Sequence, residues 1–117
     1  MLRNIKIVFE DEWLLVVNKP AGLLTVPAPV KDSRTLTDIL NKDVEERGLS
    51  YRVHPCHRLD RETSGLIVYA KGKSIQQKIM EEFKRKQVKK SYIAFAHGRI
   101  ERAAGDIEFP IDGQSAY

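Results

Sequence analysis

Hydrophobic residues in the first twenty positions follow the pattern of two paired β-strands. Apolar and polar residues alternate over 5–9, the acidic stretch 10–12 follows, and residues 13–18 are almost continuously apolar. Alternation is typical of a half-buried strand, whereas a continuous apolar run is typical of a strand with both faces covered. The pattern therefore predicts a β-hairpin whose second strand is the more deeply buried. The sequence KPAG at 19–22 ends that strand, because proline cannot supply a ladder donor.

Two later segments have the 3.6-residue period of amphipathic helices. The first has Thr35 as its N-cap, with Asp38 three residues later, and closes at Gly48. The second begins at Ser74, where Gln77 completes the same capping pattern. The apolar face of the first helix consists of Leu36, Ile39, Leu40 and Val44, and that of the second of Ile75, Ile79, Met80 and Phe83. Both faces are wide enough to pack against a sheet.

Further extended segments lie between and after the helices. Residues 23–26 form a short extended piece, 66–70 a buried strand, and 91–96 an alternating strand. Another extended segment at 107–109 is cut by proline, and 112–117 has the composition of a turn that leads into one more strand. The resulting order of β, β, α, β, α, β predicts a mixed α+β domain.

Composition fits one soluble globular domain over residues 1–117. Hydrophobic residues make up 42% of the chain and charged residues 31%, a balance that argues against disorder. No apolar run is long enough to span a bilayer, and the N-terminus lacks the apolar core of a signal peptide. The lone Cys56 cannot form an internal disulfide and is expected to be a buried or half-buried thiol. We therefore expect a cytoplasmic protein.

Positive charge is concentrated in one segment. The net charge of the chain is +4, but residues 71–102 hold ten Lys or Arg against three Glu, which gives that segment +7. Such a field attracts polyanions such as RNA, and it would also attract an anionic membrane surface. The alternative is a solvated helix face with basic flanks and no partner.

A turn between two ordered segments carries the strongest candidate for chemistry, Asp60. A carboxylate held ionised by Arg58 and Arg61 can act as a nucleophile, a base or an electrostatic stabiliser. The hydroxyls of Thr63 and Ser64 can fix the loop by hydrogen bonds. The alternative is an aspartate that caps its own turn through nearby backbone N–H groups.

A metal site is not expected, although His54, Cys56 and His57 lie close together in the sequence. Imidazole and thiolate are zinc ligands, but the chain has one more histidine, His97, and no second cysteine. The paired spacing of an ordinary zinc site is therefore missing.

Three motifs in order resemble the RluA class of pseudouridine synthases. The run 57–60 (HRLD), followed by TSG at 63–65 and by the strand after it, resembles the signature of that class. The sequence VNKPAGL at 17–23 resembles its N-terminal motif, and KSYIA at 90–94 resembles its tyrosine-bearing motif. The resemblance extends from Ile5 to the end of the chain.

The resemblance implies a mixed, largely antiparallel sheet with packed helices, and isomerisation of uridine to pseudouridine in structured rRNA or tRNA. It implies that Asp60 is the nucleophile, that the target base is flipped out of its stack, and that Tyr92 packs against the uracil. The alternative for Tyr92 is a core strand aromatic. No metal or other cofactor is implied. The RNA-binding residues implied are Arg58, His57, Arg61 and Lys90. The residues expected to shape the loops are Thr63, Ser64, Gly65, Pro20 and Gly22, while Lys19 is expected to wall the site rather than react.

One part of the family pattern is missing from the sequence. The class has a downstream motif that supplies a basic partner for the aspartate, and residues 1–117 do not contain it. We therefore expect a truncated, partial catalytic domain. The alternative function is a catalytically silent RNA-binding or interaction module. A sheet that lacks strands also exposes an edge, so self-association through that edge is expected.

Overall fold

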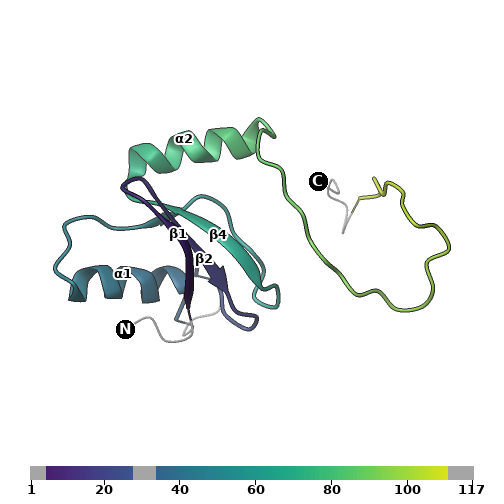
Figure 1. The fold of residues 1–117 in the computed structure, drawn as a ribbon, viewed down its shortest axis with the longest axis horizontal. Coiled ribbons are helices and arrows are strands. Elements are labelled where there is room, and N and C mark those ends of the chain that lie inside the picture. The colour runs from purple at the N-terminus through teal and green to yellow at the C-terminus, as the bar shows by residue number, and fades with distance from the viewer. Residues whose placement is uncertain (1–4, 28–33, 111–117) are drawn as a thin grey trace.

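The strands and helices follow one another in the order β1, β2, α1, β3, β4, α2 in the computed structural model, which describes residues 5–27 and 34–110 (Figure 1). Their bounds are β1 Lys6–Glu10, β2 Leu14–Lys19, α1 Leu36–Glu46, β3 His54–Pro55, β4 Gly65–Ala70 and α2 Lys73–Lys84. The predicted turn at 112–117 lies outside the described residues.

The four strands form one antiparallel sheet in the order β1-β2-β4-β3. The predicted hairpin is confirmed, and β2 is more deeply buried than β1, whose five side chains are all exposed. The six residues of β2 pair one to one with β4, from Leu14 opposite Ala70 to Lys19 opposite Gly65. The predicted strand at 66–70 is thus confirmed, although Leu66 is exposed. The α+β class with an antiparallel sheet is confirmed.

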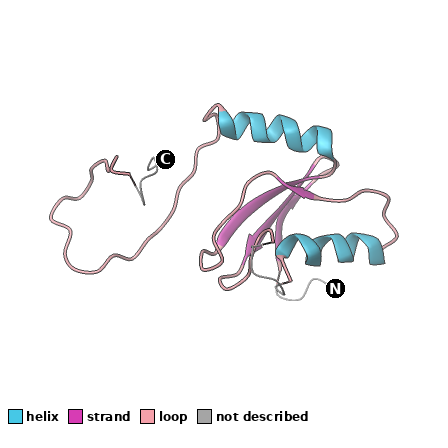
Figure 2. Ribbon diagram, turned by 180° about the vertical axis from the view of Figure 1, so that it is seen from behind, coloured by secondary structure: helices cyan, strands magenta, loops and turns pink. Residues whose placement is uncertain are grey.

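The hydrophobic core lies between α1 and one face of the sheet. Leu36, Leu40 and Val44 of α1 are buried in one cluster with Val17 of β2 and Tyr69 of β4. Because side chains alternate along a strand, this face of β2 and β4 takes every second residue. Figure 2 shows α2 on the opposite side of the sheet from α1, so the sheet is the middle layer.

The first helix has the predicted ends. Thr35 and Asp38 form a reciprocal capping box, in which each side chain accepts a hydrogen bond from the other residue's backbone N–H. At the other end, Gly48 has a φ of 71°, and the N–H groups of Gly48 and Leu49 donate to the carbonyls of Glu45 and Val44. This pair of bonds is a Schellman motif, which favours glycine in the left-handed position.

The second helix differs from the prediction at its start. It begins at Lys73, its N-cap is Gly72 with a φ of 142°, and no side chain caps it. The predicted capping box of Ser74 and Gln77 is therefore wrong, because Ser74 already lies inside the first turn. The helix has no buried residue, so its apolar face is only partly covered. Neither helix in the described part of the chain is long and apolar enough to cross a membrane.

Three predicted extended segments are not strands. Residues 23–26 form a loop whose carbonyls at Leu24 and Thr25 accept from the first N–H groups of α1. Residues 91–96 and 107–109 belong to a long exposed segment that leaves the sheet after α2 (Figure 1). An alternating pattern makes a strand only where a neighbouring strand supplies hydrogen bonds, and none of the described strands pairs with these residues. The predicted order of elements fails for the same reason, and also because the two-residue strand β3 was not predicted.

Candidate active site

The turn that carries Asp60 is closed by a hydrogen bond of 3.0 Å from the Thr63 N–H to the Asp60 carbonyl. Leu59 before it is buried, whereas Asp60 itself is exposed. Among residues 5–27 and 34–110, the carboxylate of Asp60 has neither a hydrogen bond nor an ion pair with Arg58 or Arg61. The carboxylate therefore does not cap its own turn and is open to an incoming group.

Lys19 holds the Asp60 turn against the loop that follows β2. Its side chain is completely buried, and its Nζ donates to the carbonyls of Pro20 at 3.0 Å, Leu23 at 2.6 Å and Arg61 at 3.0 Å. Burial lowers the pKa of Lys19, while the carboxylates of Glu62 and Asp60 oppose that shift. The ammonium thus acts as a bridge between two loops, and Lys19 and Arg61 lie 42 residues apart in the sequence.

The same two loops are joined by further hydrogen bonds. The Gly22 N–H donates to the Arg61 carbonyl at 2.7 Å, and the Thr25 hydroxyl both donates to the Leu59 carbonyl and accepts from the Leu59 N–H. Gly22 has a φ of 88°, which a residue with a side chain rarely adopts. Both residues that flank Asp60 are therefore fixed through their backbone.

His57 is held inside the structure. Its Nε2 accepts a hydrogen bond of 3.1 Å from the Val68 N–H, so its ring takes the place of a ladder partner beside β4. Its ring also stacks on Phe83 of α2, with 4.7 Å between ring centroids. Burial lowers the pKa of His57, and the charge of Lys90 lowers it further. These contacts describe a neutral imidazole that orders the chain ahead of Asp60.

A cleft of about 750 Å³ lies beside the turn, between β4, the end of α2 and the segment that follows α2. Thr63, Ser64 and Gly65 line one side, and Lys90 and Tyr92 line the other. Tyr92 is 62% exposed and lies outside any strand, so the alternative of a core strand aromatic is wrong. Asp60 is not among the described residues that line the cleft, so the structure brings Tyr92 to the loop but not to the carboxylate.

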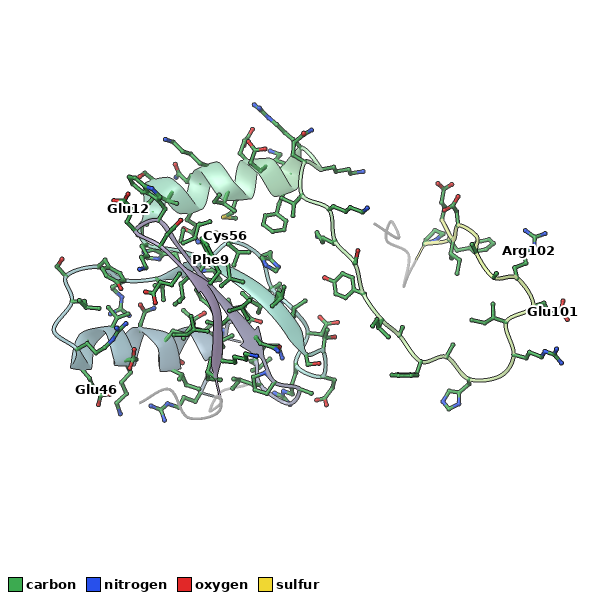
Figure 3. The ribbon with its side chains drawn as sticks, in the orientation of Figure 1. Phe9, Glu12, Glu46, Cys56, Glu101 and Arg102 are labelled. Atoms are coloured by element: carbon green, nitrogen blue, oxygen red, sulfur yellow. The ribbon has the colours of Figure 1, made fainter. Side chains whose placement is uncertain are left out.

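Only part of the predicted positive charge lies near the Asp60 turn and the cleft. Arg58, Arg61 and Lys90 are exposed around the turn and the cleft, whereas the far end of the basic segment lies well away from the sheet, as Figure 3 shows for Glu101 and Arg102. Burial raises the pKa of the Cys56 thiol to about 11, which makes it unreactive. Within the part of the chain that the structure describes, no group of three or more His, Cys, Asp or Glu could hold a metal ion.

The role of the Lys19 side chain differs from the predicted one, although the sequence contains a signal for it. Lys19 has the same parity in β2 as Leu15 and Val17, whose side chains face the core. A lysine at such a position must turn its ammonium toward polar groups, because an unpaired buried charge is costly.

The amino-acid sequence matches a known protein family. The model of the family described as RNA pseudouridylate synthase matches residues 13–116. The chain is 35% identical over 108 residues to an uncharacterized RNA pseudouridine synthase, YhcT, of Bacillus subtilis (strain 168), and the match covers 92% of this chain and 36% of that protein. It is 34% identical to the dual-specificity RNA pseudouridine synthase RluA of Haemophilus influenzae, over 90% of this chain and 46% of that protein.

Two further comparisons agree. The chain is 33% identical to tRNA pseudouridine synthase C of Pasteurella multocida, over 95% of this chain and 44% of that protein. Among solved structures, human RNA pseudouridylate synthase domain containing 4 superposes with a TM-score of 0.58 and 34% identity, over 70% of this chain and 30% of that one. The chain thus spans less than half the length of each of these relatives.

Replacing Lys19 by Met is expected to destabilise the chain by about 2 to 4 kcal/mol, because three carbonyls lose their donor. Urea unfolding followed by circular dichroism measures the change. The matched control is Lys78→Met on the exposed part of α2, which should leave the midpoint unchanged. Equal midpoints for the two variants would show that the bridge does not hold the loops.

The lowered pKa of His57 predicts a loss of stability at acid pH. The unfolded chain binds a proton near pH 6.5 and the folded chain only at lower pH, so the stabilisation is complete above about pH 6.5 and is lost as the pH falls. His57→Gln should flatten this part of the pH profile of unfolding. His97→Gln is the control, because His97 is exposed on the segment that follows α2. A profile unchanged by His57→Gln would contradict the assignment.

Proposed function

Because the chain belongs to the RNA pseudouridylate synthase family, we propose that it carries the nucleophile-bearing part of a catalytic domain that isomerises uridine to pseudouridine in RNA. The observation that supports this most directly is the exposed Asp60 carboxylate on a turn whose two flanking residues are fixed by the loop after β2. Catalysis requires such a rigid support for the reacting group. An rRNA or tRNA substrate is proposed, and with it a cytoplasmic location.

The proposed reaction starts with attack by the Asp60 carboxylate on the ribose or the base of the target uridine. The bond between N1 and C1′ breaks, the uracil rotates, and a new bond forms between C5 and C1′. The bond that the carboxylate formed with the substrate breaks again, which frees Asp60. C5 loses its proton, and N1 gains one. The carboxylate is suited to this role because no described hydrogen bond or ion pair occupies it. The proposal needs no metal or redox cofactor.

The cleft offers a place for a base that has left its stack. Extrusion of a base costs a few kcal/mol, which stacking on an aromatic ring can offset. The exposed ring of Tyr92 lines the cleft beside Thr63 and Ser64, so we propose that it packs against the uracil and handles the proton at C5. Asp60 lies on the turn beside the cleft, outside its lining.

We propose that the exposed cations around the cleft bind the phosphates of the RNA. Arg58 and Arg61 flank the nucleophile, and Lys90 lies on the opposite side of the cleft. His57 is less suited to direct contact, because its Nε2 already accepts the Val68 N–H. The comparisons do not favour the alternative of a silent RNA-binding module, and the assay below separates it from the enzyme.

Release of tritium from RNA labelled at C5 of uridine tests the proposed chemistry. The chain should release tritium above background, and Asp60→Asn should abolish the release while it retains the affinity for RNA, because only the nucleophile is lost. Asp106→Asn, an exposed change on the distant segment, is the matched control and should release tritium like the unmodified chain. RNA binding without release by any variant would support the silent module instead.

The same RNA tests the cationic contacts. Affinity should fall as salt rises, and Arg58→Ala should reduce the slope of log affinity against log salt by about 1. The matched control is Arg47→Ala, whose side chain pairs with Asp43 on α1. A slope that Arg47→Ala reduces as much as Arg58→Ala would contradict a specific contact beside the nucleophile.

We also propose that the outer edge of β1 pairs with a second copy of the chain. The strand has the sequence KIVFE with all side chains exposed, and an antiparallel pair centred on Val8 places Lys6 opposite Glu10 of the second copy. A bulge between Ile7 and Phe9 disturbs the inner ladder and will weaken the pairing.

Sedimentation velocity over a range of concentrations measures this association. The average mass should rise with concentration, and Val8→Lys should keep the chain monomeric, because it places two positive charges face to face. The control is Ile100→Lys, at an exposed apolar position on the distant segment. Association that persists in Val8→Lys would exclude the β1 edge.

A further inference from the structure

Phe83, in the last turn of α2, contacts two segments that come from opposite sides of the cleft. On one side its ring stacks on His57, with an angle of 28° between the ring planes. On the other side the Nζ of Lys90 lies over the same ring, 5.4 Å from its centroid. Stacking between aromatic rings and the placement of a cation over a ring are both stabilising contacts. One half-buried side chain thus joins both walls.

Each partner of Phe83 is close in sequence to a residue of the proposed site. His57 precedes Asp60 by three residues, and its Nε2 is tied to β4 through the Val68 N–H. Lys90 precedes Tyr92 by two residues, in a segment that has no strand partner among the described residues. The position of Tyr92 relative to the Asp60 turn therefore depends on the Phe83 ring.

The end of α2 is shaped to bring these groups together. The N–H groups of Lys86 and Gln87 donate to the carbonyls of Phe83 and Glu82, which is a Schellman motif. Its left-handed position is taken by Lys86, with a φ of 59°, and not by glycine as in α1. A residue with a side chain is strained in this conformation, so the neighbouring contacts must support it. The motif ends the helix and returns the chain toward the ring of Phe83.

We propose that Phe83 is a positioning residue that holds the Asp60 turn and the Tyr92 segment in place across the cleft. The functional meaning of this rests on the proposed synthase activity, whereas the physical coupling of the two segments does not. Phe83 touches neither the carboxylate nor the tyrosine ring in the contacts described above, so it acts through His57 and Lys90.

Nuclear magnetic resonance on the full chain tests the coupling without any need for activity. In Phe83→Leu, the ring-current shifts of the His57 ring protons and the Lys90 ε-methylene protons should both disappear. The Val68 amide proton should exchange roughly three- to tenfold faster, the effect expected from loss of one aromatic contact. Phe83→Tyr keeps the ring and should restore all three signals.

Met80→Leu is the matched control, because Met80 is exposed on the same helix and contacts neither segment in the interactions described. It should leave the signals of His57, Lys90 and Val68 as they are in the unmodified chain. A response on one side of the cleft alone, or on neither side, in Phe83→Leu would overturn the proposal. Because Phe83 lies outside the buried core cluster, Phe83→Leu is expected to remain folded.

Tritium release tests whether Phe83 affects the rate of the proposed reaction. Phe83→Leu should lower kcat by roughly 10- to 100-fold with little change in KM, because misplacement of reacting groups affects the chemical step more than binding. Phe83→Tyr should restore kcat. An unchanged kcat in Phe83→Leu would overturn the positioning role. Absence of release from the unmodified chain would refute the proposed function, and the magnetic resonance signals would still decide the coupling.

Discussion

The completely buried ammonium of Lys19 constrains the rest of the site. A charge removed from water without a counter-ion is costly, and here three backbone carbonyls replace the lost water. The carbonyls come from the loop after β2 and from the Asp60 turn, so neither loop can move without leaving the ammonium unsatisfied. This dependence explains why two motifs so far apart in sequence fold as one unit, and why the turn is rigid although its tip is exposed.

At Asp60 the backbone is held on both sides, whereas the side chain has no described partner. The residues on both sides of it are held by Thr25, Gly22 and Lys19, and its own carboxylate carries no described partner. A carboxylate engaged by a nearby arginine would be a weaker nucleophile, and a carboxylate on a loose loop would seldom be oriented for attack. The fold avoids both conditions, because the loops are joined through main-chain groups and a lysine that faces away from solvent.

Elements with local signals were predictable from the sequence, and those that depend on distant partners were not. The hairpin, β4 and the capping box of Thr35 follow from neighbouring residues, so pattern and structure agree. The predicted start of α2 at Ser74 is wrong because Gly72 is the N-cap and makes no side-chain hydrogen bond. A capping pattern based on Ser or Thr does not indicate such a start. The inward position of the Lys19 side chain could be predicted from its place in β2, on the same face as Leu15 and Val17. Its three acceptors could not be predicted, since they depend on tertiary contacts.

Residues 91–96 have the alternating pattern of a strand but do not form one. Ile93 and Phe95 are 90% and 98% exposed, so the apolar residues of the pattern gain almost no burial in the described structure. On the other side of the cleft, the N–H and carbonyl of Val68 face His57 and Cys56, and strand alternation turns those of Leu66 the same way. β3 is too short to reach Leu66, so this edge of β4 has no described ladder partner. The segment 91–96 and the free edge of β4 therefore lie on opposite sides of one cleft, and Lys90 at the start of that segment contacts Phe83 of α2.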